Sequence, residues 1–113
     1  MNELEKNELL GNLYAYYGSL LTKGQQDYFE DYYYNDLSLG EIADNHHVSR
    51  QAVYDNLKRS SKALEKYETK LHMAQDYQKF SKLAQQISTA LKNKDDQLAK
   101  EKVKYLLNEL GEV

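Results

Sequence analysis

Residues 38–53, SLGEIADNHHVSRQAV, contain the two helix-start signals that decide the fold. Ser38 and Glu41 have the spacing of a capping box, in which each side chain accepts a hydrogen bond from the other residue's backbone amide at the first turn of a helix. Ser49 is a second helix-start residue, and only residues 46–48 separate the two helices. The stretch therefore predicts a short helix, a tight turn and a longer helix.

The two predicted helices satisfy the packing requirements of a helix-turn-helix. Because the helices cross closely, a small residue must lie on the inner face of the first helix, and Ala43 takes that position. Ile42 and Val53 supply apolar side chains to the facing surfaces, and Val48 supplies a third after the turn. In the turn, His47 stands where glycine normally takes a left-handed conformation, which histidine tolerates.

Outward side chains on the first turns of the second helix reach base edges when such a helix enters a major groove. The candidate nucleic-acid-binding residues are Ser49, Arg50, Gln51, Tyr54, Lys58, Arg59 and Lys62. Ser49 would cap the helix and contact phosphate, the next four would face the groove, and the last two would position the backbone. Asp55 opposes this role, since a carboxylate repels phosphates and base acceptors unless it meets a cytosine amino group.

The charge distribution allows two interpretations. The whole chain has a net charge of −3, but residues 1–48 contain two lysines and nine acids, for a net of −7, whereas residues 49–70 have a net of +3. A basic stretch on an acidic body can be an electrostatic footprint for nucleic acid. It can equally be the solvated face of a helix, because +3 is modest for phosphate binding.

The segment before the helix-turn-helix also has helical patterning. Residues 9–21 show one apolar stripe and predict a helix that ends near Gly18, where a residue able to take a positive φ can close a helix. Thr22 and Gln25 form a further capping box, which predicts a second helix over 23–34.

A long helical stretch follows from Arg50, since the chain has no proline and no glycine follows until residue 111. Leu57, Leu64 and Leu71 recur every seven residues and predict a packing stripe against the helical body or a second chain. Residues 93–96, NKDD, are the one clear interruption, after which a final amphipathic helix is predicted.

These elements together predict an all-α protein in which a helix-turn-helix core over 20–64 packs on the N-terminal helix. A long helix and a C-terminal helical hairpin would follow. We expect residues 1–70 to form the N-terminal helix and helix-turn-helix domain. Residues 71–113 would form a C-terminal extension, for packing or dimerisation, within the same compact unit. The apolar stripe of this extension exceeds what one small body covers, which predicts a homodimer.

Composition excludes several function classes. The chain has no cysteine, which excludes disulfide scaffolds and thiol chemistry. It shows no phosphate-cradling glycine loop, no nucleophile elbow and no clustered metal ligands, so we expect no catalysis, no cofactor and no metal. Its start lacks a signal-peptide pattern and no apolar run approaches a membrane span, so we expect no membrane insertion and a cytoplasmic location.

The eleven tyrosines have two possible roles, nucleic-acid contact or core packing. The clusters at residues 14–17 and 32–34 could be stacking platforms for single-stranded nucleic acid. They could also be core residues whose hydroxyls reach water, which we expect for most of them. Tyr54 is the exception that we expect to be a contact residue.

Two resemblances extend this interpretation. Leu21-Thr22, the aromatic-rich helix after it, residues 37–43 and residues 49–53 resemble the promoter-reading region 4 of bacterial sigma factors, over roughly residues 20–64. Residues 49–59, SRQAVYDNLKR, resemble more closely the YlxM family of small bacterial proteins, and there the whole chain fits, including its lysine-rich C-terminal half.

The YlxM resemblance implies a role in secretion. Members of that family are generally encoded beside the GTPase of the signal recognition particle and are described as helix-turn-helix regulators linked to that pathway. It therefore implies a nucleic-acid-binding regulator whose partner is duplex DNA or the particle's RNA. The alternative is a protein-interaction module, without DNA binding, that modulates the particle's GTPase or its RNA.

Overall fold

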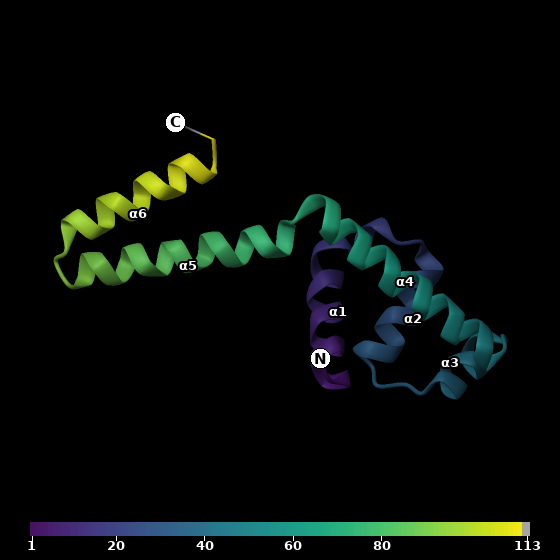
Figure 1. Ribbon diagram of the computed structural model, residues 1–113. Helices are drawn as coiled ribbons and strands as arrows, with labels where there is room; N and C mark the ends of the chain where they lie inside the picture. The colour runs from purple at the N-terminus through teal and green to yellow at the C-terminus, as the bar shows by residue number, and fades with distance from the viewer. Residues whose placement is uncertain (112–113) are drawn as a thin grey trace. The chain divides into compact units, whose positions relative to one another are not determined.

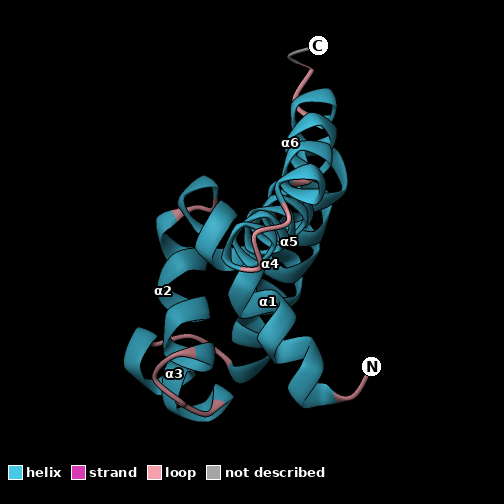
Figure 2. Cartoon of the chain, turned by 90° about the vertical axis from the view of Figure 1, so that its left-hand side faces the viewer, coloured by secondary structure: helices cyan, strands magenta, loops and turns pink. Residues whose placement is uncertain are grey.

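The computed structural model describes residues 1–111, and every regular element in this range is a helix (Figures 1 and 2). The helices are α1 (Glu3–Tyr17), a 3₁₀ turn (Gly18–Leu20), α2 (Lys23–Tyr33), α3 (Leu39–His46), α4 (Arg50–Leu71), α5 (Met73–Lys92) and α6 (Asp96–Glu109). The predicted all-α fold is confirmed. No helix among the described residues is long and apolar enough to cross a bilayer.

Contacts divide the chain into two compact units, residues 1–74 and residues from Gln75 onward. The sequence predicts a boundary near residue 70 within one compact unit. The division falls inside the first turn of α5 because Ala74, only 7% exposed, is buried in the core of the first unit. The two units are therefore described separately below.

The core of the first unit consists of two apolar clusters. One joins α1, α2 and α4 and contains Leu10, Leu13, Tyr17, Leu21, Phe29, Leu64 and Ala74. The other lies within the helix-turn-helix and contains Ile42, Ala43, Val53 and Leu57. Three of the four apolar residues predicted to form the helix-turn-helix core are thus buried. The fourth, Val48, is 39% exposed, since it lies on the surface of the turn.

The clustered tyrosines belong mainly to this core. Tyr14 stacks on Phe29 with ring centroids 4.4 Å apart, and Tyr33 contacts the same phenylalanine at 4.3 Å. Tyr17 is fully buried. The Tyr14 hydroxyl donates a 2.6 Å hydrogen bond to Glu30, so its polar end is satisfied at the edge of the core.

The long helix predicted after Arg50 is interrupted at a place that sequence patterning did not indicate. α4 ends at Leu71, and His72 takes a left-handed conformation with φ 56°. Leu71, third in the heptad series, is 51% exposed and so contributes little to the stripe that buries Leu57 and Leu64. α5 starts directly afterwards, at Met73.

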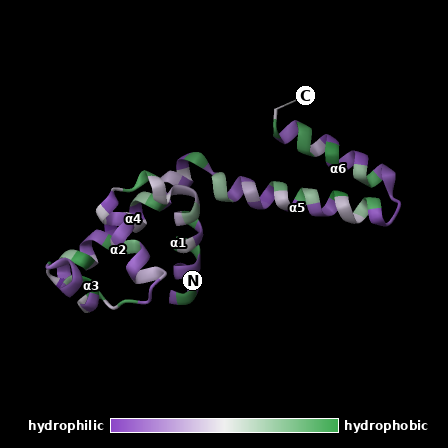
Figure 3. Ribbon diagram, turned by 180° about the vertical axis from the view of Figure 1, so that it is seen from behind, coloured by the Kyte–Doolittle hydropathy of each residue, from purple (hydrophilic) through white to green (hydrophobic). Residues whose placement is uncertain are grey.

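The second unit is an antiparallel pair formed by α5 and α6. The predicted interruption at 93–96 is confirmed: Lys94 is left-handed, and the side chain of Asp95 caps α6 by accepting the amide of Leu98. An ion pair of 2.9 Å between Lys79 and Glu109 joins the two helices. Apolar and polar residues alternate along both helices (Figure 3), and Leu83, Ala90 and Ala99 are buried between them.

Candidate nucleic-acid interface

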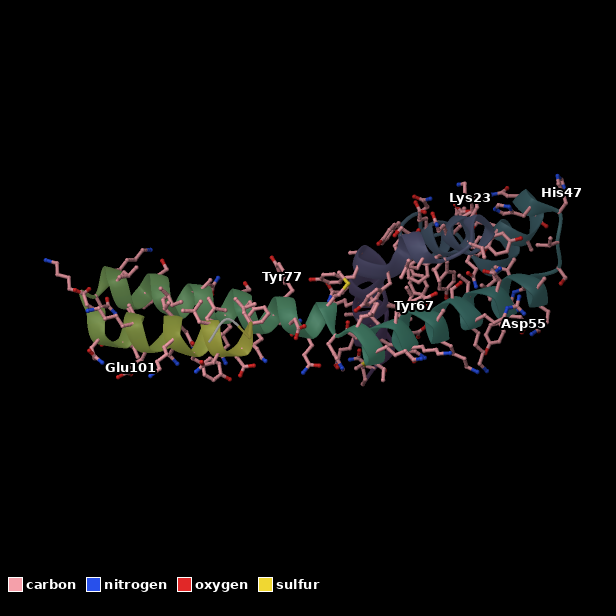
Figure 4. All side chains as sticks on the ribbon, turned by 90° about the horizontal axis from the view of Figure 1, so that it is seen from above. Lys23, His47, Asp55, Tyr67, Tyr77 and Glu101 are labelled. Carbon is pink, nitrogen blue, oxygen red and sulfur yellow. The ribbon has the colours of Figure 1, made fainter. Side chains whose placement is uncertain are left out.

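The turn between α3 and α4 has the geometry of a Schellman motif. His47 has φ 55° and ψ 44°, and its amide donates to the carbonyl of Asp44 at 3.4 Å. The amide of Val48 donates to the carbonyl of Ala43 at 3.0 Å, which closes the end of α3. Histidine thus occupies the left-handed position predicted for it, at the tip of the helix-turn-helix (Figure 4).

Both predicted caps around this turn are present. The amide of Glu41 donates to the hydroxyl of Ser38 at 3.1 Å, and the amide of Ser38 donates to the carboxylate of Glu41 at 3.0 Å. Hydrogen bonding to the carboxylate from Ser38, first from its backbone amide and then from its side chain, holds the pKa of Glu41 below its ordinary value of 4.5. At the start of α4, the hydroxyl of Ser49 accepts the amide of Ala52 at 3.0 Å.

α4 separates a buried face from an exposed one. Its buried residues are Val53, Leu57, Ser60 and Leu64. A helix advances about 100° per residue, so the six candidate residues from Arg50 to Lys62 fall within one half of its circumference, which does not overlap this buried stripe and borders it at Arg50. All six are exposed. The structure therefore brings together on one surface the residues selected from the sequence.

Four cations on this face have no ion-pair partner within residues 1–111. The ion pairs formed there are Lys23 with Asp27, His46 with Asp31, and Lys79 with Glu109. None involves Arg50, Lys58, Arg59 or Lys62. Their charges are consequently available to an external anion.

Asp55 lies on the same face (Figure 4), and its carboxylate accepts a 3.0 Å hydrogen bond from the side-chain amide of Gln51. Because this amide donates to Asp55, the carbonyl oxygen of Gln51 is the end that can still accept from a ligand. The pair thus presents mainly acceptors at the centre of the face, together with the second N–H of the Gln51 amide as a donor.

Tyr54 and Lys58 also line a cavity that sequence analysis did not identify. The cavity has a volume of about 250 Å³ and is lined by Lys6, Tyr32, Tyr33, Leu39, Tyr54, Leu57, Lys58 and Ser61. These residues come from four helices, α1 to α4. No local motif links Lys6 to Tyr54, because only the packing of α1 beside α4 brings them together.

His46, just before the turn, has a structural role. Its ring packs edge-on against Tyr28 with centroids 4.6 Å apart, and its Nε2 lies 3.3 Å from a carboxylate oxygen of Asp31. Among residues 1–111, no three His, Cys, Asp or Glu side chains are close enough to share a metal ion.

A short helix, a Schellman turn and a second helix with an exposed cationic face define a helix-turn-helix protein. The chain belongs to the family described as "Putative helix-turn-helix protein, YlxM / p13 like", which matches residues 4–105. The family resemblance found in the sequence is thereby confirmed.

Relatives in other bacteria support this membership. A UPF0122 protein of Limosilactobacillus reuteri is 58% identical over 76 residues, which are 67% of each chain. A UPF0122 protein of Limosilactobacillus fermentum is 53% identical over 85 residues, 75% of each chain. One from Streptococcus suis is 47% identical over 104 residues, which cover 92% of this chain and 90% of the relative.

Proposed function

We propose that this chain is a nucleic-acid-binding regulatory protein that uses the exposed face of α4 as its reading surface. The observation that carries the proposal is the set of four cations on that face, Arg50, Lys58, Arg59 and Lys62, which have no ion-pair partner among the described residues. α4 is the second helix of the helix-turn-helix, and its cations have no internal partners among the described residues. Such cations can bind the phosphates and base edges of a nucleic acid.

The first turn of α4 carries the specificity. Arg50 at its start reaches guanine acceptors, and the remaining acceptor of Gln51 meets a base amino group. Ser49, Arg59 and Lys62 hold phosphates and set the register. The Asp55 carboxylate disfavours any nucleic-acid site that places no hydrogen-bond donor opposite it. A cytosine amino group is therefore its best partner.

The family resemblance supports a place in the signal recognition particle pathway, and we further propose a cytoplasmic location and a homodimer. In this proposal the protein acts by binding and not by catalysis, and its partner is duplex DNA or the particle's RNA. The exposed apolar residues of the α5–α6 hairpin, including Leu91 and Leu110, support self-association.

A second candidate function is a protein-interaction module that modulates the particle's GTPase or its RNA. The net charge of −7 over residues 1–48, together with Asp55, favours its action on the GTPase, because an acidic body is repelled by the phosphates of DNA and RNA alike. Measurement of GTP hydrolysis by that GTPase, with and without this protein, separates the candidates. An unchanged rate and the absence of a complex would exclude the module.

Substitution of Arg50 tests the first candidate. The variant Arg50→Ala should weaken binding to a labelled nucleic acid by about 1–3 kcal/mol and relax sequence specificity. Lys100→Ala is the matched control, since Lys100 is an exposed cation on α6, outside the helix-turn-helix. Fluorescence anisotropy measures both. Equal affinity of Arg50→Ala and the parent would remove this assignment.

A further inference from the structure

The cavity beside α4 combines aromatic rings with cations. Three phenol rings, from Tyr32, Tyr33 and Tyr54, line it together with the ammonium groups of Lys6 and Lys58. None of its lining residues is acidic, although residues 1–48 have a net charge of −7. The cavity is therefore a local exception to the charge of the segment that builds half of its wall.

Its aromatic side chains differ in packing and exposure. Tyr33 is fixed against Phe29 at 4.3 Å, and Tyr32 stands nearly perpendicular to Tyr33, with centroids 5.0 Å apart. Tyr54, on α4, is 48% exposed. The rings from α2 thus pack against other rings, whereas the ring from α4 has an open face on which a planar ligand can stack.

Hydrogen-bonding groups are also present. The hydroxyl of Ser61 donates to the carbonyl of Leu57 at 3.0 Å, which leaves the serine oxygen as an acceptor for a ligand N–H group. Lys6 and Lys58 have no ion-pair partner among residues 1–111. A planar ring with N–H donors and an attached anion matches this set of groups, and a nucleotide has all three features.

We propose that this cavity holds one unpaired nucleobase of a nucleic acid bound along α4. The base stacks on Tyr54 beside the α2 tyrosines, and Lys6 and Lys58 contact the phosphate attached to it. This inference rests on the function proposed above and makes it more specific: the preferred ligand is a helical stem with an unpaired nucleotide, and not an uninterrupted duplex.

The test compares two fluorescent DNA duplexes of identical sequence, one fully paired and one with a single-adenine bulge. Stacking of one base on an aromatic side chain should make the bulged duplex bind about five- to 150-fold more tightly. Tyr54→Ala should bring this ratio of affinities close to one. Tyr105→Ala is the matched control, since Tyr105 is 49% exposed and lies on α6, and it should keep the parent ratio.

The outcomes separate this inference from the proposed function. One outcome is that the parent binds both duplexes with equal affinity while Arg50→Ala lowers the affinity for both. In that case the nucleic-acid-binding function stands and the cavity is excluded as a site for an unpaired base. If Tyr54→Ala keeps the parent's ratio of affinities for the two duplexes, the cavity is likewise excluded as the base-binding site. If neither duplex binds, both proposals fail. Circular dichroism of each variant establishes that the fold is retained.

Discussion

The hydroxyl of Tyr17 donates a 2.6 Å hydrogen bond to the carboxylate of Glu68, 51 residues further along the chain. The same hydroxyl accepts the amide of Met73 at 3.0 Å, and Glu68 accepts the amide of Ala74 at 3.1 Å. Burial and this carboxylate raise the pKa of Tyr17, so the hydroxyl keeps its proton at neutral pH. These bonds occupy the first amides of α5 and hold the break between α4 and α5 at His72.

Tyr17→Phe tests the strength of this arrangement. The variant keeps the buried ring but removes one of the hydrogen bonds to the Glu68 carboxylate and leaves the amide of Met73 without its acceptor, so the unfolding free energy should fall by about 1–3 kcal/mol in urea titration. Tyr28→Phe is the control, since its hydroxyl makes no hydrogen bond within residues 1–111 and its loss should matter little. Equal effects of the two substitutions would show that the Tyr17 hydroxyl is not structurally important.

Gly18 is required for space and not for backbone conformation. Its φ of −56° is ordinary, contrary to the positive value expected from the sequence, but an added Cβ would lie 2.8 Å from the ring of Tyr14. Gly18→Ala should therefore destabilise the protein by about 1–3 kcal/mol. Gly11→Ala, within α1 and facing open space, should instead stabilise it by about 0.5–1 kcal/mol. Thermal unfolding distinguishes the two signs, and a gain at both positions would contradict the steric account.

His47 carries backbone strain in the helix-turn-helix turn. Its side chain is exposed, and its left-handed conformation is unfavourable for any residue with a Cβ. His47→Gly should raise the unfolding free energy by up to about 1 kcal/mol, after allowance for the greater freedom of glycine in the unfolded chain. His47→Val, which tolerates this region poorly, should lower it. A stabilising valine would mean that the turn does not require the left-handed conformation.

The capping box of α3 should make the helix-turn-helix sensitive to acid. Because the folded pKa of Glu41 lies below 4.5, its contribution to stability is fully present above that value and is lost as the pH falls through the folded pKa. Carboxyl NMR titration should therefore place the pKa of Glu41 below 4.5, and amide exchange at the start of α3 should accelerate in acid.

Glu41→Gln supplies the control for this pH dependence. Gln25 already performs the same role in the capping box of α2, where its side chain accepts the amide of Thr22 at 3.0 Å. The glutamine variant should keep the cap and lose its acid sensitivity. If amide exchange at the start of α3 still accelerates in acid in this variant, the acid sensitivity comes from a group other than Glu41.

Local signals predicted the helix-turn-helix closely. Helix caps bond to amides only three residues further along the chain, as at Thr22, Ser38 and Ser49. Such local contacts can be located from the spacing of residues in the sequence alone, and so can the small Ala43. The exposed face of α4 followed from helical periodicity in the same way.

Long-range contacts were beyond sequence patterning. The break at His72 depends on Tyr17, whose hydroxyl reaches the start of α5 only after α1 packs against α4. The cavity at Tyr54 depends on Lys6 for the same reason. The steric need for Gly18 arises from the position of one ring, which a residue pattern does not encode.

The salt dependence of nucleic-acid binding tests the central claim most directly. With Lys58, Arg59 and Lys62 each neutralising one phosphate, the logarithm of the association constant for a mixed-sequence duplex should fall with the logarithm of salt concentration with a slope of about −2 to −3. Removal of Arg59 and Lys62 together should make the slope shallower by about 2. An absence of binding at low salt, or a slope that these substitutions leave unchanged, would contradict the assignment of α4 as a nucleic-acid-binding surface.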